Sequence, residues 1–243
     1  MLSCICIVQA QAPGKAPDGG AADWRADYGY ILSKYVKASG FDYASLNKNK
    51  ADIDKLISVT KALEHHTPEY IQQYSRDEQF AIYVNAYNAW MLVKALELYP
   101  IDSILNKYPN FYKEAKIIVG NELTFDVLEH EILRKQYFDA RVHFAVNCAS
   151  KGCPPLLNEP YAGHKLEEQL NLATTNFLNS EHGIKLKSAQ SSIAEASQLF
   201  EWFASDFIKQ EGSVVNFINK YTDHPIKTVS GYLDYDWSLN QSS

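Results

Sequence analysis

The segment Arg76–Leu98 constrains the fold of this chain more than any other. Ser75 followed by Glu78 has the spacing of a helix capping box, and Pro100 ends the helical pattern just beyond Leu98. At about 100° per residue, apolar side chains cover most of the surface of this helix. The sequence therefore predicts a long central helix that is buried on most sides.

Two amides, Asn85 and Asn88, lie among the apolar residues of this helix. A buried amide that lacks hydrogen-bond partners costs about 1–3 kcal/mol. We therefore expect both side chains to be hydrogen-bonded. Either they tie neighbouring backbone segments together, or they orient a catalytic side chain or a substrate.

The rest of the pattern predicts an α+β fold, a helix-rich single domain with a small sheet packed on the central helix. At the level of fold, papain-like and transglutaminase-like proteins offer an analogy. Gly120-Asn121 suggests the turn of a hairpin, and Thr124 can cap a helix through Arg134 on which Glu129 faces the core and His130 points away. Helical spacing also marks residues 28–36, 51–63, 166–178, 198–208 and 214–221.

Three parts of the chain differ in composition. Residues 1–12 resemble a truncated signal peptide, because the apolar run Leu2 to Val8 precedes Ala10-Gln11-Ala12. Residues 13–22 are expected to be a flexible linker, and residues 23–243 a single domain. These features predict export to the periplasm or the medium. No later run approaches the roughly 20 apolar residues of a membrane span, so no integral membrane segment is expected.

The net charge of -6 disfavours nucleic acid or an anionic membrane as the principal partner. A small molecule, a peptide or a glycan remains as the ligand class, and the oligomeric state stays unknown at this stage. The chain has no glycine loop for phosphate, no Gly-x-Ser-x-Gly elbow and no His-Glu-x-x-His motif, and we expect no cofactor.

The segment Arg141–Pro155 is the predicted functional centre. Its alternating residues predict a strand from Arg141 to Cys148 that runs into a turn. A regular strand would place His143 and Cys148 on opposite faces. Only a bulge, or a turn that begins at Cys148, would bring them together.

Five motifs follow one another along the chain: Phe80–Asn88, Leu128–Arg134, His143–Ser150, Cys153-Pro154-Pro155 and Tyr235–Asn240. Together they resemble the DUF547 family, a domain of unknown function, over roughly residues 77–240. The resemblance implies a compact domain that occurs alone in bacterial, often exported, proteins and beside other modules in eukaryotes, and it implies no reaction. Ala149 departs from the glycine that is frequent there, which narrows the backbone conformations open after Cys148. The motif positions are Asn85, Asn88, Glu129, His130, His143, Cys148, Ser150, Cys153, Asp236, Trp237 and Asn240.

Three hypotheses follow for the centre. In the first, Cys148 and Cys153 form a disulfide that closes the turn of a structural or binding module, as an oxidising compartment would permit. In the second, the protein is a cysteine-dependent hydrolase or acyltransferase that acts on a peptide or amide. Its catalytic residues would be Cys148 or Cys153 as nucleophile, His143 as base, and Glu129 or Asn85 as the group that orients the base.

In the third hypothesis, His143, one cysteine and Glu129 form an open three-ligand site of a metal-dependent hydrolase. A closed structural zinc site lacks a second pair of cysteine or histidine ligands, so we assign no metal ligands. Asn147, Ser150 and Asp236 are further candidates for binding or orienting groups, although a turn is the simpler role for Asp236.

Overall fold

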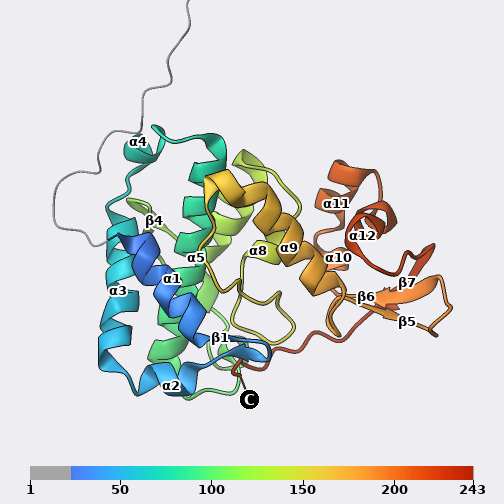
Figure 1. The fold of residues 1–243 in the computed structure, drawn as a ribbon, viewed down its shortest axis with the longest axis horizontal. Coiled ribbons are helices and arrows are strands. Elements are labelled where there is room, and N and C mark those ends of the chain that lie inside the picture. The colour runs from blue at the N-terminus through green and yellow to red at the C-terminus, as the bar shows by residue number, and fades with distance from the viewer. Residues whose placement is uncertain (1–22, 243) are drawn as a thin grey trace, which may run out of the picture.

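The structure is a computed structural model that describes residues 23–242 (Figure 1). The predicted signal peptide and linker lie outside the described residues. The first helix, α1 (Trp24–Tyr35), begins after Asp23, whose side chain accepts a hydrogen bond from the Arg25 backbone N–H at 3.1 Å. This N-cap satisfies one of the four N–H groups that have no partner within the helix.

The predicted central helix forms with the expected bounds as α5 (Arg76–Leu98). The Ser75 side chain caps it by accepting a hydrogen bond from the Glu78 backbone N–H at 3.2 Å. Figure 1 shows α5 beside α1 and α3 (Lys50–Glu64), and α3 is in contact with both of the other helices. Most of α5 is buried, because its apolar side chains continue around nearly the whole helix.

Residues 166–178 and 214–221 also form the predicted helices, α9 (Leu166–Leu178) and α12 (Val214–Tyr221). The expected helix over residues 198–208 is instead two helices, α10 (Leu199–Trp202) and α11 (Ala204–Glu211), with Phe203 between them. The short elements of the N-terminal half are β1 (Val36–Lys37), β2 (Gly40–Phe41), α2 (Tyr43–Asn47), α4 (Pro68–Ile71), α6 (Ile104–Lys107) and the 3-10 turn η1 (Phe111–Lys113).

The predicted hairpin is present as β3 (Lys116–Ile118) and β4 (Asn121–Leu123), which pair antiparallel, but its turn lies one residue earlier than the expected Gly120-Asn121, because Asn121 pairs with Ile118. Its turn residues Val119 and Gly120 both have positive φ, 50° and 72°. Two consecutive residues of positive φ characterise the type I′ turn that suits the twist of a two-residue hairpin. Thr124 then caps α7 (Phe125–Val127), as expected, by accepting from the Val127 N–H at 3.1 Å.

The C-terminal part contains a three-stranded sheet in the order β5 (Ile184–Leu186), β6 (Ile193–Ala196), β7 (Thr228–Tyr232). β5 and β6 pair antiparallel, whereas β6 and β7 pair parallel. Beyond β7 the chain returns to the first half of the molecule (Figure 1), where the Asn240 carbonyl accepts from the Phe41 N–H at 2.8 Å. The α+β, helix-rich prediction is therefore confirmed, with three small separate sheets among residues 23–242.

The predicted strand over Arg141–Cys148 is wrong. The chain makes one helical turn there, α8 (Val142–Ala145). Asp139 starts this turn, because its side chain accepts from the Arg141 N–H at 2.9 Å and its carbonyl accepts from the Val142 N–H at 3.0 Å. All residues of α8 are buried, so the apolar alternation reflects burial on every side rather than a two-faced strand.

Candidate functional site

A cavity of about 190 Å³ brings together the four predicted catalytic residues, which are His143, Cys148, Cys153 and Glu129. They come from α8, from the loop that follows it, and from η2 (Leu128–Gln136). The remaining lining is largely aromatic and includes Tyr87, Tyr112, His130, Val146, Leu199, Trp202, Phe203, Tyr235 and Trp237.

The sulfur of Cys148 has two hydroxyl partners in this cavity. It lies 2.8 Å from the Ser150 hydroxyl oxygen and 3.2 Å from the Tyr235 hydroxyl oxygen. The adjacent Cys153 side chain is the largest cause that lowers the Cys148 pKa to about 6, followed by the hydrogen bonds of Ser150 and Tyr235, while burial opposes them. Cys148 is therefore largely a thiolate at neutral pH, and it is only partly buried.

The backbone around Cys148 is unusual. Ala149 takes a positive φ of 61°, a conformation that alanine adopts much less readily than glycine. Its N–H donates to the Asn147 side-chain oxygen at 2.9 Å, and the Asn240 side chain donates to that same oxygen at 3.0 Å. Strained backbone that surrounding hydrogen bonds hold in place is common at functional sites.

Cys153 is the buried partner of Cys148. Its sulfur accepts a hydrogen bond from the Cys148 backbone N–H at 2.9 Å. Burial raises the pKa of the Cys153 thiol well above its usual range, and the hydrogen bond and negative charge of Cys148 raise it further. Both cysteines are free, so the predicted disulfide is not formed in this structure.

Within residues 23–242, His143 makes no hydrogen bond to the Cys148 sulfur. Its Nε2 lies 2.8 Å from Asp206 Oδ2, and its ring stacks on Phe203 with centroids 3.9 Å apart. Burial lowers the pKa of His143, although the hydrogen bond to Asp206 opposes this, so the imidazole is neutral at pH 7. A neutral imidazole that donates Nε2–H to Asp206 leaves Nδ1 as an acceptor, and this buried Nδ1 has no partner.

Asp206 is the functional residue that sequence reasoning missed. It lies on α11, 63 positions beyond His143, and it also accepts from Arg134 Nε at 2.7 Å. These hydrogen bonds outweigh burial and hold the pKa of its carboxyl well below the usual range. No local pattern marked Asp206.

Glu129 and His130 both line the cavity, so the expectation that His130 points away is wrong. The cause is η2, a π-helix whose wider turn is seen in the Tyr137 N–H donating five residues back to the Ile132 carbonyl at 3.3 Å. A π-helix changes which residues share a face, and such turns occur frequently at functional sites. His130 Nδ1 lies 3.0 Å from an Arg134 guanidinium nitrogen.

The Glu129 carboxyl faces the same cavity as the Cys148 thiolate. Burial is the largest cause that raises the Glu129 pKa, and the negative charge of Cys148 adds to it. The Tyr87 hydroxyl donates to Glu129 Oε2 at 3.2 Å. A carboxyl group whose pKa is raised can hold a proton near neutral pH and donate it to a reacting group.

The two amides of α5 hold different segments. Asn88 donates to the Ala145 carbonyl at 2.9 Å and accepts from the Asn147 N–H at 2.9 Å, so it fixes the backbone that leads into Cys148. Asn85 makes the same pair of hydrogen bonds with Tyr161, at 2.8 and 2.9 Å, outside the cavity lining. Asp206, rather than Asn85, therefore orients His143.

Asp236 does not line the cavity, although its neighbours Tyr235 and Trp237 do. Its side chain accepts from the Ser238 N–H at 2.9 Å, which forms an Asx turn. Tyr235 and Trp237 pack together with ring centroids 4.5 Å apart, and Trp202 stacks on Trp237 at 5.8 Å. The C-terminal motif thus supplies an aromatic wall beside Cys148.

The three-ligand metal set is not assembled. No group of three or more His, Cys, Asp or Glu side chains within residues 23–242 is arranged to hold a metal ion.

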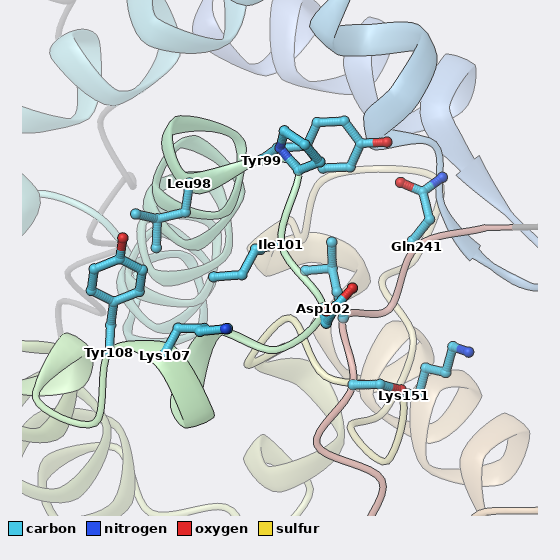
Figure 2. A pocket seen from close by; sticks show the side chains of 11 residues that line it. Leu98, Tyr99, Ile101, Asp102, Lys107, Tyr108, Lys151 and Gln241 are labelled. Atoms are coloured by element: carbon cyan, nitrogen blue, oxygen red, sulfur yellow. The ribbon is translucent and has the colours of Figure 1, made fainter.

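A separate cavity of about 790 Å³ lies where α5 ends, and no cysteine lines it (Figure 2). Lys151, from the loop between the two cysteines, lies on its rim together with Gln241.

Comparison with known proteins identifies one family. The model of the family described as "Protein of unknown function, DUF547" matches residues 71–178, which confirms the resemblance over that range. The match contains both cysteines, His143 and Glu129, whereas Asp206 and Tyr235 lie beyond it. No curated protein and no solved structure matches the chain. None of the helices that residues 23–242 form is long and apolar enough to cross a membrane.

Proposed function

We propose that this chain, which matches the DUF547 family over residues 71–178, is a cysteine-dependent hydrolase or acyltransferase that acts on a peptide or amide bond. One observation carries the proposal. The Cys148 sulfur is hydrogen-bonded to the Ser150 and Tyr235 hydroxyls inside a cavity that Cys153, His143 and Glu129 also line.

Cys148 is the nucleophile. Thiolate, rather than thiol, attacks a carbonyl carbon, and a pKa of about 6 makes the thiolate the main form at pH 7. Cys148 therefore needs no direct contact with an imidazole in order to lose its proton. Cys153 is less suited to this role, because it is buried and its pKa is raised.

Glu129 donates a proton in the first step, and His143 accepts a proton in the second. When the sulfur attacks the substrate carbonyl and the C–N bond breaks, the protonated Glu129 carboxyl gives its proton to the leaving nitrogen. Water, or an acceptor amine or alcohol, then attacks the thioester and gives its proton to His143 Nδ1. The C–S bond breaks, the thiolate returns, and the proton passes back to the Glu129 carboxylate.

Asp206 positions the imidazole for this second step. Its hydrogen bond to Nε2 fixes the tautomer in which Nδ1 carries the free lone pair. Phe203 holds the ring plane by stacking on it. The roles of nucleophile, base and orienting carboxylate are thus those used by other covalent hydrolases.

The other hypotheses have less support. A purely structural disulfide module gives no reason for a partly exposed thiol of lowered pKa inside a cavity. A metal-dependent hydrolase lacks an assembled ligand set among the described residues. The proposal does not depend on export, which residues 1–12 suggest and which stays a prediction.

The test uses an activated ester, p-nitrophenyl acetate, with the full chain and with Cys148→Ala, Cys153→Ala and His143→Gln. Wild type should release p-nitrophenol in a burst and then turn over, with the acetyl group on Cys148 by peptide mass mapping. Cys148→Ala should show no burst. His143→Gln should be acylated but deacylate about 10²-fold more slowly or worse, which is typical of a lost general base.

Cys153→Ala is the matched control, because it keeps the nucleophile and removes the neighbouring sulfur, which accepts from the Cys148 N–H and is the largest cause that lowers the Cys148 pKa. It should retain the burst at pH 9 and lose much of it at pH 7. Acetylation of wild type at sites other than Cys148 would overturn the proposal. So would deacylation of His143→Gln at the wild-type rate.

A further inference from the structure

We infer that Cys153 is a resolving thiol and that the Cys148–Cys153 pair is a site of reversible oxidation by hydroperoxides. This inference goes beyond acyl transfer, because it requires no acyl substrate. In this inference the predicted disulfide is the oxidised state of a cysteine pair that is free in this structure.

The loop that carries the two cysteines is already closed at its base. The Asn147 side chain donates to the Pro154 carbonyl at 2.8 Å, which joins the residue before Cys148 to the residue after Cys153. Inside the loop, the Cys153 N–H donates to the Ser150 carbonyl at 3.1 Å. The two cysteines therefore face each other across a short turn.

The sulfurs are placed for bond formation. The Cys148 N–H donates to the Cys153 sulfur at 2.9 Å, and both cysteines line the same cavity. A disulfide forms without movement of the backbone only when the two cysteines are already close together. The loop supplies that proximity in the reduced state.

The two thiols differ in the way that oxidation followed by resolution requires. Cys148 is partly exposed to the cavity and is polarised as a thiolate, whereas Cys153 is buried. Susceptibility to peroxide follows thiolate character and exposure, so Cys148 is oxidised first. Redox-sensing cysteines frequently have a second cysteine beside them that completes the reaction.

The chemistry balances with a hydroperoxide as the oxidant. The Cys148 thiolate attacks the terminal peroxide oxygen and the O–O bond breaks, which gives a sulfenic acid and a hydroxide or alkoxide ion that takes a proton from solvent. Cys153 sulfur then attacks the Cys148 sulfur, the S–O bond breaks, and the Cys153 thiol proton leaves with that oxygen as water. An external dithiol reduces the resulting disulfide back to two thiols.

The first step also activates the second. The negative charge of Cys148 and its hydrogen bond are two of the causes that keep the Cys153 pKa high, after burial. Sulfenic acid is neutral, so both contributions vanish once Cys148 is oxidised. Cys153 therefore loses its proton more easily once Cys148 is a sulfenic acid, which is the form that Cys153 attacks.

The test treats the reduced full chain with a small excess of hydrogen peroxide, alkylates the remaining thiols and maps tryptic peptides by mass. Trypsin cuts after Arg141, Lys151 and Lys165, so a Cys148–Cys153 disulfide links peptides 142–151 and 152–165. Wild type should give this linked pair, lighter by two hydrogen atoms than the separate peptides. Dithiothreitol should restore both thiols completely.

Cys153→Ser is the informative variant, because it keeps a hydrogen-bonding group in place and cannot form the disulfide. It should gain two oxygen atoms on Cys148, as sulfinic acid, in a form that dithiothreitol does not reverse. If this variant fails to fold, the wild-type peptide map alone decides. Wild type that accumulates sulfinic acid without the linked pair would overturn the inference, whatever the outcome of the ester assay.

Discussion

Helix α5 and the cysteine segment, residues 139–155, are in contact but acquire their conformations in different ways. The conformation of α5 follows from its own sequence, which supplies a cap, apolar stripes and a stop. The cysteine segment has a single helical turn, and its backbone is held by side chains that are distant in sequence, such as Asn88, Tyr112 and Asn240. Substitution of these distant side chains should therefore change the reactivity of Cys148 more than it changes the fold.

The strongest test of this difference compares Asn88→Ala with Asn85→Ala. Each substitution leaves one buried backbone N–H and one buried carbonyl without a partner, so each should lower the free energy of unfolding by about 2–5 kcal/mol. Only Asn88 holds the backbone before Cys148. Only Asn88→Ala should therefore slow alkylation of Cys148 by iodoacetamide at pH 7.

Chemical denaturation gives the stability of both variants, and peptide mapping after brief alkylation gives the reactivity of the thiol. Asn85→Ala is the control for general destabilisation, because its hydrogen bonds match those of Asn88 in number and type. Equal loss of Cys148 reactivity in the two variants would show that the cysteine segment is not held separately from the rest of the fold.

The sequence predicted α5, α9 and α12 with their observed bounds, because the information for each lies in its own periodicity, which a serine cap supports in α5 and α12. It failed for Arg141–Cys148, where alternating residues fit a strand. The turn there depends on Asp139, and Arg141 pairs with Glu167 on α9, a contact that no local pattern reveals. Burial on all sides removed the periodicity that would have indicated a helix.

In the candidate site, too, local sequence predicted some features, whereas contacts between distant residues set the others. Cys148, Cys153, His143 and Glu129 could be named from residue type and motif, and they do line one cavity. Their partners could not be named, since Asp206 lies 63 residues from His143 and Tyr235 lies 87 residues from Cys148. His130 was misplaced because helical periodicity assumes an α-helix, whereas η2 is a π-helix.

The second prediction concerns the charge on Cys148. Ser150→Ala and Tyr235→Phe each remove one hydroxyl hydrogen bond to the sulfur. A hydrogen bond to a charged group contributes about 1.5–3 kcal/mol, so each substitution should raise the Cys148 pKa by about 1–2 units. The pH profile of alkylation should have its midpoint at about 6 in wild type and at correspondingly higher pH in the variants.

The same shift predicts how stability depends on pH. The pKa of Cys148 falls from 9.0 to about 6 on folding, so between these values the unfolded chain binds more protons and stability rises with pH. Cys153 acts in the opposite direction above pH 9, because its pKa is raised by folding. Unfolding measured from pH 6 to pH 9 should show a smaller rise in Ser150→Ala than in wild type. If the alkylation midpoint stayed unchanged in both Ser150→Ala and Tyr235→Phe, these two hydroxyls would not be what lowers the Cys148 pKa.

The smallest effect should come from Asp236, which belongs to the same C-terminal motif as Tyr235 but does not line the cavity. Its side chain accepts hydrogen bonds only from Ser238, in a turn near the surface. Asp236→Ala should therefore lower the free energy of unfolding by about 0.5–1.5 kcal/mol, the net contribution of an ordinary hydrogen bond. Because Tyr235 reaches the sulfur from the adjacent position, Asp236→Ala should leave the alkylation midpoint at about 6. A midpoint that moved as far as in Tyr235→Phe would mean that the turn, rather than the tyrosine hydroxyl, sets the state of Cys148.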